Sequence, residues 1–72
     1  MEDYCIDYRG DTRRAARDLR ARLRIAGSGQ VINFVCNDEQ VIRLLREITF
    51  NDGVITKQET TEKGVSITIR KT

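Results

Sequence analysis

The stretch QVINFVCNDEQ (residues 30–40) predicts a β-strand that leads directly into the start of a helix. Residues 30–36 are rich in β-branched and aromatic side chains and alternate at period two, which is typical of a half-buried strand. The side chains expected to face the core are those of Ile32, Phe34 and Cys36. A glycine-containing break at residues 27–29 precedes the stretch, so the strand begins a new element.

The residues after this strand predict a helix near positions 38–51. Asn37 is followed three residues later by Gln40, a spacing that resembles a capping box at the start of a helix. The sequence Asn51-Asp52-Gly53 contains residue types that end helices. The apolar face of this helix is expected to consist of Val41, Ile42, Leu44, Leu45 and Ile48.

The residues before the central strand predict another strand and helix. Residues 4–9 alternate at period two and read as a strand that Gly10 ends. Asp11 or Thr12 then offers a side-chain oxygen to the unpaired N–H groups of a first helical turn. A helix is therefore expected over residues 12–26.

The carboxyl-terminal third predicts a β-hairpin. Residues 54–60 and 65–70 read as two strands joined by a turn near residues 62–64. The element order is therefore β-α-β-α-β-β. Right-handed crossovers place both helices on the same side of the sheet. We expect an α+β fold, a two-layer α/β sandwich in which two helices cover one face of a four-stranded mixed sheet.

The predicted layers assign side chains to a buried core and to an open face of the sheet. The residues expected to be largely buried are Ile6, Leu19, Leu23, Ile32, Phe34, Leu45, Ile67 and Ile69. Those expected on the open face are Cys5, Asp7, Asn33, Ser66, Thr68 and Arg70. If the first two strands are parallel, the turn at residues 10–14 and the segment at residues 36–38 lie at the same edge, where open α/β sheets tend to bind ligands.

The length and composition indicate one small globular domain, spanning residues 1–72. The amino terminus lacks the pattern of a signal peptide, and no apolar run approaches the length of a bilayer, so we expect a cytoplasmic protein without membrane contact. The formal net charge is +2, yet residues 11–26 alone carry six arginines and two aspartates. A basic helix on a slightly acidic body steers anionic partners.

The arginines of the first helix form the main candidate binding surface. Four of them fall within about 60° of one another at 100° per residue: Arg13, Arg17, Arg20 and Arg24. Together with Arg14 they are the candidate residues for binding an acidic protein surface or RNA. The alternative is a solvated helix face on which Asp18 pairs with Arg14 and Arg22 at i±4.

The chain offers little for catalysis. Cys5 and Cys36 have no spacing that suggests zinc, and there is no histidine to serve as general base or metal ligand. We therefore expect no enzymatic activity, no cofactor and no metal site. Cys36 is a possible thiol site, because it should lie beside the arginine-rich turn, a setting that lowers a thiol pKa. Its alternation with Ile32 and Phe34 favours instead a buried structural cysteine.

Several segments, taken in order over about residues 5–71, resemble the TusA/SirA family of small sulfur-carrier proteins. Ile6-Asp7-Tyr8-Arg9-Gly10 resembles the family's opening Leu-Asp-x-x-Gly strand, and Ser28-Gly29-Gln30-Val31 its Pro-Gly-Glu-x entry to the second strand. Cys36-Asn37-Asp38 falls where the family has an acidic pair. Gly53-Val54 and the closing Ile67-Thr68-Ile69-Arg70-Lys71 resemble its last two strands.

The resemblance also shows which chemistry is missing. Family members carry a persulfide on the cysteine of a Cys-Pro-x-Pro motif at the amino end of the first helix. The matching positions here are Arg13, Arg14, Ala15 and Ala16. The resemblance therefore implies a carrier-inactive relative that acts by binding, as a partner of sulfur-transfer or tRNA-modification machinery.

Two alternatives remain at the level of sequence. The same β-α-β-α-β-β order occurs in the archaeal chromatin protein Alba and in the carboxyl-terminal domain of translation initiation factor three, so a nucleic-acid-binding protein is one of them. A sulfur carrier that uses Cys36 is the other. The protein is expected to be a monomer or a weak homo-oligomer.

Overall fold

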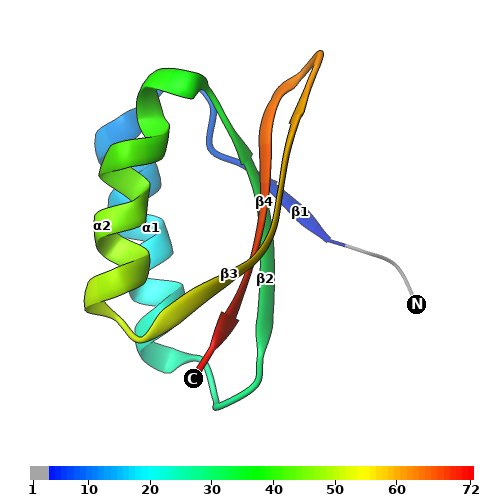
Figure 1. Cartoon of the computed structure of the whole chain (residues 1–72). Coiled ribbons are helices and arrows are strands. Elements are labelled where there is room, and N and C mark those ends of the chain that lie inside the picture. The colour runs from blue at the N-terminus through cyan, green and yellow to red at the C-terminus, as the bar shows by residue number, and fades with distance from the viewer. Residues whose placement is uncertain (1–3) are drawn as a thin grey trace.

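The structure is a computed structural model that describes residues 4–72, in which two helices lie side by side on one face of a four-stranded sheet (Figure 1). The elements in chain order are β1 (Cys5–Asp7), α1 (Thr12–Ile25), β2 (Val31–Cys36), the 3-10 turn η1 (Asp38–Gln40), α2 (Val41–Phe50), β3 (Gly53–Thr61) and β4 (Gly64–Lys71). The predicted fold class and element order are confirmed.

The sheet has the strand order β1-β2-β4-β3. β1 and β2 are parallel, whereas β4 pairs antiparallel with both β2 and β3, so the sheet is mixed. β1 and β3 are its edge strands. Each βα unit crosses over on the same side, which places both helices over the face that β2 and β4 fill with alternating apolar side chains (Figure 1).

The core lies between the helices and the two central strands. Phe34, near the middle of β2, is fully buried, and its ring centroid lies 5.2 Å from that of Tyr8 at an interplanar angle of 48°. Tilted aromatic pairs at this separation are favourable. The other fully buried large side chains are Leu19, Leu23, Cys36, Gln40, Leu44, Ile48, Ile67 and Ile69.

Two predicted core residues are only half-buried. Ile6 packs against the core from β1. Because β1 is a three-residue edge strand with a neighbouring strand on one side only, the Ile6 side chain stays partly exposed. Leu45 lies on the flank of α2 rather than on its core-facing stripe. Tyr8 is buried although it was not in the predicted core, because its ring packs on Phe34.

The first strand is shorter than the predicted range of residues 4–9. Tyr8 still donates a backbone hydrogen bond to the carbonyl of Val35 (2.9 Å). The next amide, that of Arg9, instead donates to the Asp7 carboxylate (3.0 Å), so the chain turns out of the sheet toward α1. An aspartate that accepts from the amide two residues later forms an Asx-type turn.

The second helix also begins differently from the prediction of a helix over residues 38–51. Residues 38–40 form a 3-10 turn, and the α-helix spans Val41–Phe50. The Gln40 side chain reaches back to accept a hydrogen bond from the backbone N–H of Asn37 (2.7 Å), and the backbone N–H of Gln40 donates to the backbone carbonyl of Asn37 (3.0 Å). These bonds tighten the first turn, and 3-10 geometry is common at helix starts.

The β3–β4 turn packs tightly against the end of β2. Gly64 has φ = 133°, and a Cβ atom at this position would lie 2.5 Å from the Cys36 carbonyl oxygen. Glycine is therefore required here both by conformation and by space. Among residues 4–72, no helix is both long enough and apolar enough to cross a membrane.

Candidate anion-binding surface

Helix α1 packs on the sheet through a narrow apolar stripe, and most of its arginines lie outside this stripe. The Asp11 side chain caps the helix by accepting a hydrogen bond from the Arg14 amide (3.0 Å). Its buried residues are Ala15, Ala16, Leu19 and Leu23. Two of these four side chains are alanine, so the helix can sit close to the sheet while its remaining positions stay on the outside.

Four of the five candidate arginines are exposed and lack an ion-pair partner within the described part of the chain. They are Arg13, Arg14, Arg17 and Arg24, which we call the arginine surface. Arg13 and Arg14 lie in the first turn of α1, where positive charge opposes the helix dipole. Unpaired cations at such positions raise the free energy of the isolated protein slightly, by a few tenths of a kcal/mol each at exposed sites.

The fifth candidate, Arg20, departs from the prediction that it is solvent-exposed. It is half-buried, and its Nε lies 3.9 Å from Oε1 of Glu47 on α2. The same carboxylate accepts a 2.6 Å hydrogen bond from Nη1 of Arg43. Glu47 is buried between the two helices and is shared by two arginines, so Arg20 serves helix packing rather than the arginine surface.

A second carboxylate, Asp18, ties α1 to the chain that leaves β1. Its Oδ2 accepts hydrogen bonds from the Tyr8 hydroxyl (2.5 Å) and from Nε of Arg22 (2.7 Å). Partial burial alone would raise the Asp18 pKa, but the hydrogen bonds from Tyr8 and Arg22 outweigh it, and the net pKa is lowered. The pairing of Asp18 with Arg22 is one of the two that the solvated-face alternative predicts; the other, between Asp18 and Arg14, does not form.

Helix α2 contributes two arginines that sequence reasoning did not select. Arg43 bridges to Glu47, and Arg46 is exposed beside the apolar side chains of Ile42 and Phe50. The available signal was a pair of arginines three residues apart on a helix whose other face is apolar. It was missed because the arginines of α1 are far denser in sequence.

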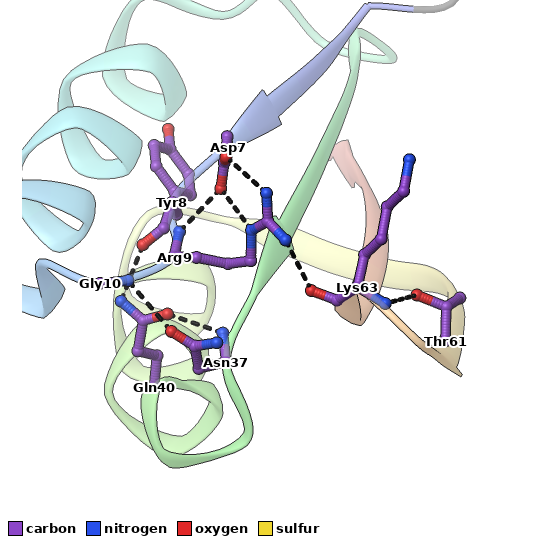
Figure 2. Close-up of polar contacts among 8 residues, drawn as sticks. All are labelled: Asp7, Tyr8, Arg9, Gly10, Asn37, Gln40, Thr61 and Lys63. Atoms are coloured by element: carbon purple, nitrogen blue, oxygen red, sulfur yellow. Dashed lines mark hydrogen bonds and ion pairs between the residues drawn. The ribbon is translucent and has the colours of Figure 1, made fainter.

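The edge where the first two strands end brings together the segments that were expected to be neighbours (Figure 2). The Gly10 amide donates to the Asn37 side-chain carbonyl (3.0 Å), and Nε2 of Gln40 donates to the Tyr8 carbonyl (2.7 Å). The turn that precedes α1 is thereby held against the start of η1. This confirms the predicted proximity of the two βα junctions.

Arg9 closes the same edge from the open side of the sheet. Its Nε and Nη2 donate to the two carboxylate oxygens of Asp7 (2.9 and 2.8 Å), and its Nη1 donates to the Lys63 carbonyl (3.0 Å), as Figure 2 shows. The hydrogen bonds from Arg9 lower the Asp7 pKa to about 2. Arg9 is fully engaged within the chain, so it adds nothing to the arginine surface.

Cys36, the possible thiol site, lies in the core with 0% of its surface exposed. Burial, with a smaller contribution from the nearby charges of Asp38 and Glu39, raises its pKa to about 11. The thiol is therefore protonated at neutral pH and out of contact with solvent, which are poor conditions for a nucleophile. The prediction that Cys36 faces the core is confirmed. Cys5 is exposed.

These pKa shifts predict how stability depends on alkaline pH. Burial, and then the hydrogen bond to Asp18, raises the Tyr8 pKa above that of an unfolded tyrosine. Burial also raises the Cys36 pKa above that of an unfolded cysteine. A group whose pKa is raised by folding stabilises the fold below its unfolded pKa, and that contribution is lost as pH rises. The free energy of unfolding should fall from about pH 8.5 for Cys36 and further from about pH 10 for Tyr8.

Urea denaturation between pH 7 and pH 11 measures this dependence. In Tyr8→Phe the decrease above about pH 10 should be smaller than in the parent, because position 8 no longer carries a phenol that ionises on unfolding. The decrease that begins near pH 8.5 should persist in this variant. Equal alkaline slopes above pH 10 in the two proteins would contradict the assignment to Tyr8.

The sequence matches no protein-family model, and a search of curated proteins found no significant match.

Proposed function

We propose that this chain is a non-catalytic binding protein whose arginine surface binds an acidic region of a partner protein. The observation that carries the proposal is the division of the helix arginines into two groups. Arg20, Arg22 and Arg43 each lie within ion-pair distance of Asp18 or Glu47, whereas the arginines of the arginine surface are exposed without such a carboxylate among residues 4–72. Exposed guanidiniums bind carboxylates in bidentate geometry.

Exposed apolar side chains at the carboxyl ends of the two helices, one of them next to Arg24, favour a protein partner over RNA. Ile25 and Phe50, 86% and 81% exposed, end the two helices. Lys71 holds these helix ends together, because its Nζ donates to the carbonyls of Leu23 (2.7 Å) and Asn51 (3.2 Å). Arginine next to exposed aromatic and aliphatic groups is the composition of protein–protein interfaces.

The resemblance to the TusA/SirA family adds the kind of partner to this proposal. Arg13 occupies the position of the family's carrier cysteine, at the amino end of α1. On this proposal, a relative that lacks the nucleophile binds components of sulfur-transfer or tRNA-modification machinery without carrying sulfur. RNA itself remains the alternative ligand, because phosphates also recognise arginine.

The prediction is that an acidic peptide binds this surface and that the arginines carry the binding. Fluorescence anisotropy is measured with a labelled peptide rich in Glu and Leu, and in parallel with labelled tRNA, at two salt concentrations. Arg13→Gln/Arg17→Gln should weaken peptide binding about tenfold or more and reduce its salt dependence, since two cations are lost from the contact. Arg20 is avoided because its loss would disturb the packing at Glu47.

A charge-matched control separates this surface from net charge. Lys63→Gln/Arg70→Gln removes two cations from the hairpin, where the side chains of Lys63 and Arg70 are exposed, and should leave peptide binding unchanged. Tighter binding of tRNA, with a salt slope that falls by about one unit per arginine removed, would identify RNA as the ligand instead. If neither probe binds, the proposal is wrong and the arginine surface is only a solvated helix face.

A further inference from the structure

Strand β3 presents a long edge that no other strand of the described structure covers. It has nine residues and pairs with β4 alone, whereas the opposite edge strand, β1, has three. Along its outer side, β3 therefore carries backbone N–H and C=O groups without a strand partner. Such an edge is a template for pairing with another chain.

The charges on β3 complement those of a second copy of the same strand. Lys57 and Glu59 lie opposite Thr68 and Ser66 of β4, so both are on the open face of the sheet, where Nζ and Oε1 are 3.9 Å apart. An antiparallel pairing of two β3 strands about a two-fold axis at Gln58 places Lys57 of each copy opposite Glu59 of the other. Oppositely charged residues directly across an antiparallel pair attract each other.

The flank of α2 supplies an apolar surface on the same side of the molecule. Glu47 faces α1 through Arg20, and at 100° per residue Ile42 and Leu45 lie about 140° and 160° away from it around the helix. Ile42 is 71% exposed, and Leu45 is half-buried. Because α1 is tied to the β1 end of the sheet through Asp18, this flank of α2 faces the β3 end.

We propose that two copies of this chain associate through their β3 edges, with reciprocal Lys57–Glu59 ion pairs and the α2 flanks packed together. The pairing continues the sheet across the two-fold axis and places α2 next to its symmetry mate on the same face. Gln58 is level with Ile67 and, through it, with Phe34 near the middle of β2, so along the strand direction the axis is level with the middle of the sheet. The strand edge and the helix flank therefore both favour a second copy of this chain as the partner.

The register of this pairing also resists other strands. A lysine and a bulge are common means of protecting an edge strand, and β3 has both, with its register shift between Ile55 and Lys57. Lys57 should repel the edge strands of unrelated proteins. A second copy of β3 differs from these, because its Glu59 lies opposite Lys57 and pairs with the lysine charge. Specificity of this kind combines attraction to one partner with repulsion of others.

Sedimentation velocity over a range of protein concentrations tests the interface by charge reversal. The parent should form a dimer, and Lys57→Glu or Glu59→Lys should each raise the dissociation constant about tenfold or more, since two opposed pairs then carry like charges. Mixing the two single variants should restore the dimer, because one copy then presents two carboxylates opposite two lysines. The double variant Lys57→Glu/Glu59→Lys should dimerise as the parent does.

Two further variants test the helix flank and control for charge. Ile42→Glu should weaken the dimer, and Lys63→Glu, which reverses a lysine in the hairpin turn away from the axis, should not. A parent that remains monomeric up to about 1 mM overturns the proposal. It is also overturned if the single variants dimerise like the parent, if the mixture stays monomeric, or if Ile42→Glu has no effect. The arginine surface takes no part in this contact, so these outcomes are independent of the proposed anion binding.

Discussion

Replacement of Phe34 by alanine is expected to lower the free energy of unfolding by about 3–5 kcal/mol. The side chain is fully buried, and its ring packs on that of Tyr8, with centroids 5.2 Å apart. Small domains have total stabilities at the low end of about 5–15 kcal/mol, so this variant should be largely unfolded at physiological temperature. Urea denaturation followed by circular dichroism measures the effect.

Two variants on the same strand keep this prediction testable. Phe34→Leu retains most of the apolar volume and should remain folded with a smaller loss, so a denaturation midpoint can be measured. Val31→Ala changes an exposed residue of β2 and should cost less than about 1 kcal/mol. Similar midpoints for Phe34→Ala and Val31→Ala would mean that Phe34 does not centre the core.

Replacement of Gln40 by leucine should cost about 2–4 kcal/mol although the two side chains have similar volumes. Gln40 is buried, and its side chain links the start of η1 to the chain just after β1: it accepts from the backbone amide of Asn37 (2.7 Å) and donates to the backbone carbonyl of Tyr8 (2.7 Å). Leucine offers neither bond, so a backbone donor and a backbone acceptor lose their partners in the interior. The measurement is again the free energy of unfolding in urea.

The matched control for Gln40 is Gln30→Leu. Gln30 is exposed, and within residues 4–72 its side chain accepts a single long hydrogen bond, 3.3 Å from the Gly27 amide, so its replacement should change stability by less than about 0.5 kcal/mol. Nuclear magnetic resonance of Gln40→Leu should also show altered amide shifts at Gly10, which is bonded to the neighbouring Asn37 side chain. Equal stabilities for the two glutamine variants would contradict a structural role for Gln40.

Much of the candidate surface could be predicted from sequence because helix periodicity alone assigns residues to faces. The placement of Arg13, Arg17 and Arg24 on the outside of α1 follows from the buried positions of Leu19 and Leu23. Periodicity cannot predict which side chains of the neighbouring helix lie next to these arginines. Arg20 lies on the predicted stripe, yet its position next to Glu47 depends on how α1 and α2 pack.

The sequence by itself determined the order of the elements, the capping interaction between Asn37 and Gln40, and the alternation that buries Phe34 and Cys36. Each of these depends on residues within a few positions of one another, so local rules of conformation and burial are enough.

Only the tertiary structure decided which charges remain available to a partner and which surfaces remain uncovered. The sharing of Glu47 by Arg20 and Arg43, the half-burial of Leu45 and the open edge of β3 all depend on distances between segments far apart in the chain. Those distances are set by the packing of the helices on the sheet, where a shift of a few ångströms makes or breaks an ion pair.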